Sequence, residues 1–440
     1  MSQRSLAVLI NGEWMGDLTD QNNLWGFQYA ASWLSRRQPY PLSPSLPLGP
    51  EPLLDGATVR PVQWFFDNLL PEETLRTVIG REEGVPAEDA FGLLERLGAE
   101  SAGALVLQPH GAEDAAQGTQ ELTHEVLSAR IRQLPVASLN KQAAKRMSLA
   151  GAQHKMVVCF DPATGGLAEP LKGSASTHIL KPDSKAVGYP RSVVNETFTM
   201  RLAAMMGVEV PSVWRLYVPE PVYIIERFDR TRAVDGQPLR VHTVDGSQAL
   251  NESGHNKYAS ATFPSLLRLI GLCLNKAVAR LEIFRWVLFN TLVGNSDCHL
   301  KNISFLIDSE GMRVAPFYDL LCTAVYHTPA LADEPSMAVW PAETLAMPVA
   351  GAAKFCDVTQ EKLVATGIEL GLGKGTAVRE TARMIARLPE AADGLIRQMT
   401  EEYESMPILA QISPETRAAE LHVLRAIRHV VIADMLRRVI

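Results

Sequence analysis

One stretch in the second half of the chain most limits what this sequence can fold into. Ile283, Val287, Leu288 and Leu292 recur on one face of a predicted helix, and Gly294 is typical of its end. A polar loop follows over residues 294–302, and then two short β-runs form a hairpin across residues 308–311. A polar loop between two regular elements is the place where this chain is expected to carry chemistry.

That loop and the residues after the hairpin supply a carboxylate, an amide and a second carboxylate. Asp297 precedes Asn302 by five positions, the interval between the catalytic aspartate and the metal-binding asparagine of protein kinases, and Asp319 follows the hairpin. Phosphoryl transfer needs a group that takes up the proton of the nucleophile, and Mg²⁺, which prefers oxygen ligands. The spacing favours this chemistry, although such a string alone is as typical of a solvated turn.

A kinase also needs a cation that projects from a strand toward the nucleotide phosphates. Lys181 ends a predicted strand over residues 177–181, as the lysine of the V-A-I-K strand does. The helix predicted over residues 194–206 begins beside Glu196, the candidate for orienting that lysine. The alternatives are a surface lysine with a buried stem and a glutamate favoured by the helix dipole.

Two further segments are candidates for nucleotide contacts. Residues 147–155 are mostly small, so that backbone amides could approach phosphate oxygens, but they match no glycine-rich phosphate motif. A strand predicted over residues 222–226 ends in Glu226, Arg227 and Phe228, where backbone groups and an apolar ring could meet an adenine. A plain surface loop and an ordinary strand end are the competing interpretations.

Composition excludes several classes of protein. The chain has 440 residues, of which 47% are hydrophobic and 21% charged, so a largely disordered chain is excluded. The net charge of -7 argues against a dedicated binder of nucleic-acid backbones. The five cysteines form no C-x-x-C pair, and no apolar run reaches the ~20 residues of a membrane helix. We expect a cytoplasmic protein without a membrane association.

The order of elements predicts an α+β fold with three domains. Residues 1–135 read as a mixed α/β module, residues 136–230 as a small β-rich lobe, and residues 231–440 as a large helical lobe. The expected architecture is therefore a bilobal, protein-kinase-like fold with an extra N-terminal α/β subdomain.

The same residues carry a resemblance to a known family. The chain resembles the HipA family of serine/threonine kinase toxins, bacterial proteins that pair with a HipB-type helix-turn-helix antitoxin. The resemblance covers nearly the whole length and rests on motifs in the family's order, at residues 41–48, 65–71, 148–155, 177–181, 195–196, 226–230, 297–302 and 317–319. Each motif is weak alone, whereas the ordered set is specific.

The resemblance implies a role for each position. Asp297 would be the catalytic aspartate, with His299 and Lys301 beside the transferring phosphoryl group, and Asn302 and Asp319 would bind Mg²⁺. Lys181 would hold the phosphates of ATP, and Glu226, Arg227 and Phe228 would lie at the adenine. The loop that covers the phosphates would comprise Ala150, Gly151, Ala152, Gln153, His154 and Lys155.

The resemblance also implies regulation, a substrate and a partner. Ser148 matches the family's autophosphorylation site, and a phosphate there would add about -1.5 to -2 charges beside a site built for ATP. The substrate would be an aminoacyl-tRNA synthetase, with glutamyl-tRNA synthetase as the first choice. DNA would be contacted only through the antitoxin.

One departure and two alternatives remain. Val244 stands where the family often has an acidic residue, between His242 and Asp245, which leaves the role of that position open. A metal-dependent hydrolase could instead use Asp297, His299, Asp319 and His242 as ligands, but this leaves Lys181 and Asn302 without a role. The non-enzymatic alternative is a catalytically weak kinase fold that acts as antitoxin partner and co-repressor.

Overall fold

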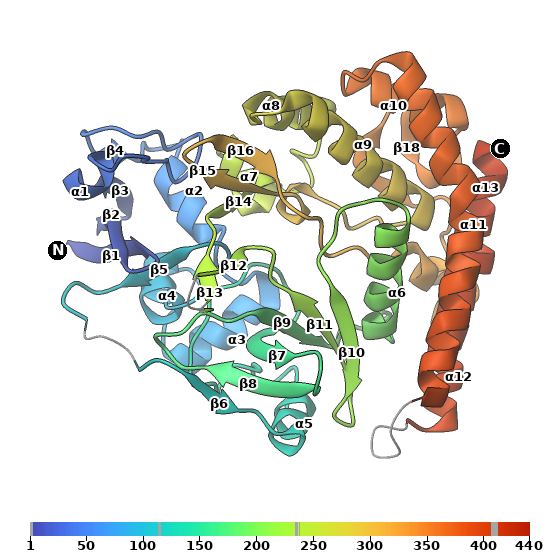
Figure 1. Ribbon diagram of the computed structural model, residues 1–440, viewed down its shortest axis with the longest axis horizontal. Coiled ribbons are helices and arrows are strands. Elements are labelled where there is room, and N and C mark those ends of the chain that lie inside the picture. Colours follow the sequence, from blue (N-terminus) through green and yellow to red (C-terminus); the bar gives the residue numbers. More distant parts are fainter. Residues whose placement is uncertain (1–2, 113–115, 234–235, 237, 406–411) are drawn as a thin grey trace. The chain divides into compact units, whose positions relative to one another are not determined.

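The computed structural model describes residues 3–112, 116–233, 236, 238–405 and 412–440, shown as a ribbon in Figure 1. The chain divides into two compact units. The first comprises Met1–Lys181, Ile225–Lys257 and Ser304–Ala315, and the second Pro182–Ile224, Tyr258–Ile303 and Pro316–Ile440. Each unit is therefore built from three separate segments of the chain.

The first unit begins with an antiparallel sheet. The predicted hairpin at Asn11 and Gly12 is confirmed, and both residues have positive φ (48° and 82°), as a tight two-residue turn requires. The order is β4-β3-β2-β1-β5, with β1 at Arg4–Ile10, β2 at Glu13–Gln21, β3 at Leu24–Tyr29, β4 at Leu53–Leu54 and β5 at Leu105–Gln108.

Short helices and a proline-rich loop accompany this sheet. The Tyr29 hydroxyl accepts the Leu42 N–H (2.8 Å) and donates to the Leu46 carbonyl (2.6 Å), so the proline-rich loop is ordered without forming a helix. The helices are α1 (Ala31–Leu34), α2 (Pro61–Asp67), α3 (Glu73–Glu83) and α4 (Ala90–Leu97).

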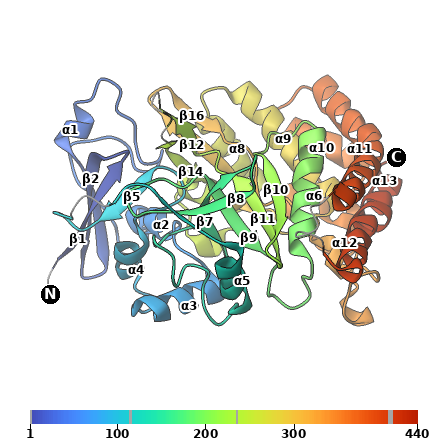
Figure 2. The ribbon, with the colours of Figure 1, turned by 60° about the horizontal axis from the view of Figure 1, so that its bottom comes forward.

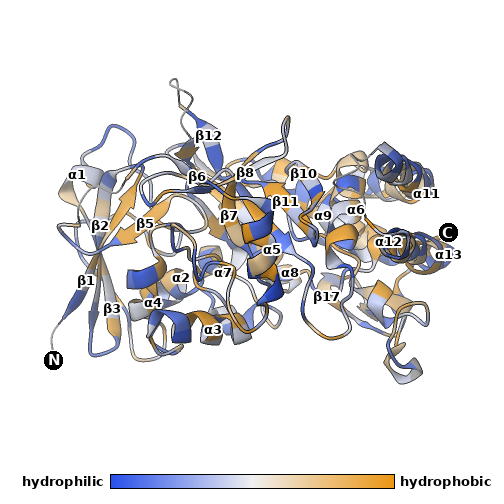
Figure 3. Cartoon of the chain, turned by 90° about the horizontal axis from the view of Figure 1, so that it is seen from below, coloured by the Kyte–Doolittle hydropathy of each residue, from blue (hydrophilic) through white to orange (hydrophobic). Residues whose placement is uncertain are grey.

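A second sheet of the first unit contains the order β9-β7-β8-β6. Its strands are β9 (His178–Pro182), β7 (Met156–Asp161), β8 (Gly166–Pro170) and β6 (Thr119–Glu121). Helix α5 (His124–Arg132) is anchored to it by a buried ion pair between Arg130 and Glu169, at 2.6 Å. In Figure 3, β5 and β7 are largely hydrophobic in colour, which agrees with their burial. The loop expected over residues 112–119 lies partly outside the described residues.

The hairpin predicted after the polar loop is also confirmed. It consists of β15 (Ser304–Asp308) and β16 (Gly311–Val314), and β14 (Thr243–Asp245) adds a third strand that was not predicted. Asp245 and Gln248 form a capping box that starts α7 (Gly246–Leu250). A separate pair of strands, β12 (Arg230–Arg232) and β13 (Pro238–Arg240), completes the first unit.

The second unit is mainly helical. Figures 1 and 2 show α6 (Ser192–Met205) beside the long α11 (Lys374–Ser405). The other helices are α8 (Phe263–Leu272), α9 (Lys276–Val293), α10 (Gln360–Glu369), α12 (Pro414–Ala426) and α13 (Ala433–Val439). The strands β10 (Val213–Tyr217) and β11 (Pro221–Glu226) are neighbours, and the pair β17 (Thr344–Val349) and β18 (Ala352–Lys354) was not predicted.

The fold is the expected mixture of helix and sheet. The predicted strands at residues 156–160, 177–181 and 222–226 and the helices that end at Gly207 and Gly294 are confirmed within a few residues. The three contiguous domains stay a prediction, since the compact units alternate along the chain. None of the helices in the described residues is long and apolar enough to cross a membrane.

Candidate active site

The polar loop of residues 294–302 follows directly after helix α9. The helix ends at Gly294 in the left-handed conformation (φ 70°), and a Cβ there would lie 2.6 Å from Val431 Cγ1 and 2.9 Å from Ala324 Cβ. Both the backbone conformation and the space therefore require glycine. The loop consequently leaves α9 in a fixed direction.

Asparagines fix the backbone of Asp297. The Asn295 Oδ1 atom accepts the Asp297 N–H at 3.0 Å, and the Asn295 amide donates to Asn290 Oδ1 at 2.7 Å. Asn302 Nδ2 donates to the Asp297 carbonyl at 3.1 Å. The interval of five residues thus has a structural reason, because Asn302 closes the loop onto the backbone of Asp297.

A second set of contacts holds the loop at Ser296. The Ser296 N–H donates to Thr323 Oγ1 at 2.6 Å, and the Ser296 hydroxyl donates to the Glu343 carboxylate. His327 Nδ1 lies 2.9 Å from the same carboxylate oxygen of Glu343. The residue directly before Asp297 is therefore fixed by its own hydrogen bonds, in addition to the contacts that Asn295 and Asn302 make with the Asp297 backbone.

Two tyrosines lie near the carboxylate of Asp297. The Tyr258 hydroxyl donates a short hydrogen bond to Asp297 Oδ1, and its ring lies edge-on to His299 with centroids 4.9 Å apart. Burial raises the pKa of Tyr189, and the negative charges of Asp297 and Glu343 raise it further. Tyr258 thus contacts both Asp297, through its hydroxyl, and His299, through its ring.

Asp319 is linked to the polar loop through its neighbours. The Tyr318 hydroxyl donates to the Lys301 carbonyl at 2.8 Å, and Phe317 stacks on Trp286 of α9 with centroids 5.4 Å apart. Asp319 itself has φ 55°, a conformation that non-glycine residues rarely adopt and that is common at functional sites.

Glu196 and Asp319 meet the same buried tyrosine. Burial raises the pKa of Tyr223 well above its usual value, and the charges of Glu196 and Asp319 and a hydrogen bond with Glu196 add to the shift. Glu196 is itself buried on α6. Its pairing with Lys181, which lies on β9 in the first unit, stays a prediction.

The donor set around the loop suits Mg²⁺. Because the Asn302 amide nitrogen donates within the loop, its Oδ1 atom is the side-chain atom that would be left to bind a metal ion, and the Asp319 carboxylate would offer the oxygen atoms that Mg²⁺ prefers. Among the described residues, no group of three His, Cys, Asp or Glu side chains could hold a metal ion. His242 stacks on Tyr40 and contacts the Leu42 carbonyl. The metal-hydrolase alternative is therefore not supported by any three-residue group in the described part of the chain.

The predicted phosphate-covering loop is anchored within the first unit. Ser148 is fully buried, its N–H donates to the Glu100 carbonyl (2.6 Å), and its hydroxyl donates to the Leu69 carbonyl (2.8 Å). The Gly151 carbonyl accepts the Glu72 N–H at 3.2 Å, and Lys155 Nζ donates to the Ala150 carbonyl at 2.5 Å. The loop is thus held by residues of the N-terminal module.

Arg227 contributes to a buried network of charges. Its guanidinium contacts Glu100 at 3.0 Å and Asp229 at 2.6 Å, so its side chain is engaged within this network. Glu100 also pairs with Arg230, Arg240 and Lys145, each at 2.6–2.7 Å. Burial alone would raise the pKa of Glu100, but the four cations outweigh it and hold that pKa well below the usual value.

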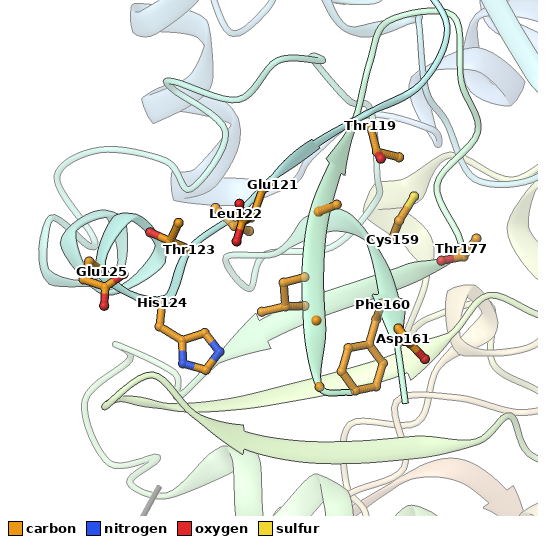
Figure 4. A pocket seen from close by; sticks show the side chains of 14 residues that line it. Thr119, Glu121, Leu122, Thr123, His124, Glu125, Cys159, Phe160, Asp161 and Thr177 are labelled. Atoms are coloured by element: carbon orange, nitrogen blue, oxygen red, sulfur yellow. The ribbon is translucent and has the colours of Figure 1, made fainter. Parts of the chain in front are cut away.

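A shallow groove of about 750 Å³ lies elsewhere on the first unit, and Figure 4 shows its lining. The groove is formed by β6, the start of α5 and the β7–β8 hairpin. None of its lining residues is one of the predicted site residues. The groove is therefore distinct from the residues that carry the expected chemistry.

These features define a class of protein, a kinase-like α+β fold in which a polar loop follows a buried helix. Residues 147–406 match the HipA-like C-terminal domain and residues 6–108 match the HipA N-terminal domain. The chain therefore belongs to the HipA family of serine/threonine kinase toxins.

Two similar proteins and one solved structure agree with this assignment. The protein named "Putative kinase Y4mE" of Sinorhizobium fredii is 38% identical, over 79% of this chain and 83% of its own length. The serine/threonine-protein kinase toxin HipA of Shewanella oneidensis is 29% identical, over 88% and 87%. The solved complex of Shewanella oneidensis HipA with HipB and operator DNA superimposes with a TM-score of 0.76 at 26% identity, covering 98% of this chain and 97% of that one.

The predicted residues fall into two groups. In the second unit, hydrogen bonds link Asp297 with Asn302 and Lys301 with Tyr318, and the charges of Glu196 and Asp319 both act on Tyr223. In the first unit lie the loop 147–155, Lys181 and the strand end at 226–228. Sequence reasoning missed Tyr258, Tyr223 and Glu100, because nothing in their local sequence signals their distant partners.

Proposed function

We propose that this chain is an ATP- and Mg²⁺-dependent serine/threonine protein kinase. The observation that carries the proposal is the state of Asp297, whose backbone is fixed by Asn295 and Asn302 while its carboxylate accepts a hydroxyl hydrogen bond. A carboxylate that is fixed in place and within reach of an O–H group is what a protein hydroxyl needs when it attacks phosphorus.

Each residue then has a task. Asp297 orients the acceptor hydroxyl and takes up its proton, and His299 and Lys301 lie in the same loop, where positive charge would favour the transferring phosphoryl group. Asn302 and Asp319 would hold Mg²⁺, which neutralises charge on the β- and γ-phosphates when bound. Lys181, which is buried on β9, would contact the phosphates of ATP.

Two further segments are the remaining proposed nucleotide contacts. The backbone of Glu226, Arg227 and Phe228 would contact the adenine, while the Arg227 side chain pairs with Glu100 and Asp229. The loop Ala150–Lys155 would cover the phosphates with its backbone N–H groups.

Regulation would act through Ser148. The serine is fully buried, so the loop must leave its present position before the hydroxyl can be phosphorylated. A phosphate could not return to a site that consists of the Leu69 and Glu100 carbonyls, because these are acceptors and repel negative charge. Autophosphorylation would therefore hold the loop open and inactivate the kinase.

The biological context follows from the relatives. We infer that the chain acts as a toxin, is neutralised by a HipB-like helix-turn-helix antitoxin, and contacts DNA through that antitoxin, since the similar HipA structure contains HipB and operator DNA. An aminoacyl-tRNA synthetase, with glutamyl-tRNA synthetase first, is the proposed substrate. Its phosphorylation would arrest translation and growth.

The test is transfer of labelled γ-phosphate by the wild type and by Asp297→Asn. Asp297→Asn keeps the shape of the side chain but removes the base, so labelling of protein should fall by about 10²–10⁴-fold. Mass spectrometry should place the self-incorporated phosphate on Ser148. Equal labelling by both proteins would remove Asp297 from the mechanism, whereas no labelling by either would favour the alternative of a catalytically weak antitoxin partner.

A further inference from the structure

The Tyr258 side chain occupies an unusual position on the candidate catalytic loop. It is 48% exposed, yet its hydroxyl donates to Asp297 Oδ1, thirty-nine residues further along the chain. Its ring packs edge-on against His299, at an interplanar angle of 82°. An exposed aromatic side chain is thus held at the one carboxylate that the proposed reaction uses as its base.

The hydrogen bond imitates the contact that a substrate would make. A serine or threonine acceptor presents an O–H donor on carbon, and the base must accept that hydrogen bond before proton transfer. The phenol of Tyr258 is the same kind of donor, and it uses Oδ1 of Asp297. While it does so, it fills one acceptor site of that oxygen and the space in front of it, where the hydroxyl of another protein would have to lie.

The two partners differ in how firmly they are held. Asp297 is fixed by Asn295 and Asn302 through its backbone. Tyr258 lies in a turn between the short helix Gly254–Asn256 and α8, whose first turn is capped by Thr262. The tyrosine is therefore the partner that can move, since a change of its side-chain rotamer releases the carboxylate without unfolding a helix.

We propose that Tyr258 is an internal block of the acceptor position, which an incoming protein hydroxyl must displace from Asp297. This inference rests on the proposed kinase function and adds to it an autoinhibitory contact in the apo protein. A hydrogen bond to a charged group is stronger than one between neutral groups, so the competition is expected to weaken acceptor binding by about tenfold. Binding of ATP is not expected to take part in the competition, because the base accepts its hydrogen bond from the acceptor hydroxyl and not from ATP.

The experiment compares the full-length wild type with Tyr258→Phe, which removes the hydroxyl and keeps the ring on His299. Phosphate transfer from ATP to myelin basic protein is measured in Mg²⁺ at several concentrations of each substrate. The KM for myelin basic protein should fall by about tenfold, while the KM for ATP stays within twofold. Tyr40→Phe, which makes the same chemical change in the N-terminal module, should leave both values unchanged, and a melting curve checks that each variant folds.

Any other result would contradict the proposal that Tyr258 blocks the acceptor position. Unchanged kinetics in Tyr258→Phe would show that the hydrogen bond does not compete with the acceptor, although the kinase function would stand. Loss of transfer would make Tyr258 a helper of the reaction, and phosphate on Tyr258 of the wild type would make it an acceptor. If neither the wild type nor Tyr258→Phe labels any protein, the kinase function itself fails, and the block fails with it.

Discussion

The buried position of the Ser148 side chain determines which substitutions the proposed phosphate-covering loop can accept. Its hydroxyl donates to the Leu69 carbonyl and its N–H to the Glu100 carbonyl, in a fully buried site. Ser148→Ala removes one hydrogen bond and leaves a carbonyl unsatisfied, which should cost about 1 kcal/mol of stability. Ser148→Asp places a carboxylate among acceptors, and burial of such a charge is prohibitive, so the loop should leave its site.

The two Ser148 variants should therefore bind ATP with different affinities. Calorimetry should show near-normal ATP binding by Ser148→Ala and at least tenfold weaker binding by Ser148→Asp. Ser35→Asp, which adds the same charge at an exposed position, is the control and should bind as the wild type. Equal ATP affinity of Ser148→Asp and the wild type would contradict the role of the loop in covering the phosphates.

At the scale of elements, α9 carries an ionisable group whose state changes near neutral pH. Burial and the negative charge of Glu209 raise the pKa of Glu282 to about 7, although Arg285 opposes the shift. A carboxyl whose pKa is raised on folding favours the native state at low pH, and that contribution is lost as the pH rises from about 4.5 to about 7. Above pH 7 the helix therefore carries an ionised Glu282 at a cost.

Glu282→Gln should remove this cost. The variant should be more stable than the wild type at pH 8 by about 1 kcal/mol, after allowance for solvent screening at a half-buried site. The difference should vanish below about pH 5, where the wild-type carboxyl is protonated. Melting curves at both pH values measure it, with the exposed Glu369→Gln on α10 as control. A difference that is the same at both pH values would show that packing and not ionisation is its cause.

The same scale explains what could be predicted from sequence. The loop of Asp297 and Asn302 was found because its spacing, the glycine that ends α9 and the following hairpin are all local features. The pair β17–β18 was missed because its short strands lie in a region of helix-forming residues. Tyr258 and Tyr223 were missed because their roles depend on partners far along the chain, which folding alone brings near.

At the scale of the whole molecule, one buried carboxylate connects the two parts of the family pattern. Glu100 lies in the region that matches the HipA N-terminal domain, whereas Arg227, Arg230 and Arg240 lie in the region that matches the C-terminal domain. All four side chains belong to the first unit. The backbone of Glu100 also holds Ser148, so the N-terminal module supports the phosphate-covering loop directly.

Glu100→Gln should therefore destabilise the protein far more than its single charge suggests. It leaves three arginines and Lys145 buried with too little negative charge, and breaking such a network typically costs about 3–5 kcal/mol. Asp308→Asn, which breaks an exposed pair with Arg313, should cost at most about 1 kcal/mol and should lose even that in high salt. Urea unfolding of both variants at low and high salt measures the contrast.

The pKa of Glu100 sets the pH range of this effect. Because the cations hold that pKa well below its usual value, the carboxylate should stabilise the fold above about pH 4.5 and lose its contribution only as the pH falls through the lowered value. Burial lowers the pKa of Lys145, a partner of Glu100, to about 8, so wild type and Glu100→Gln should differ by a constant amount only between about pH 5 and pH 6, before Lys145 loses its proton. If Glu100→Gln instead unfolds at the same urea concentration as Asp308→Asn, the network adds no net stability, and the N-terminal module must be held to the rest of the first unit by apolar packing.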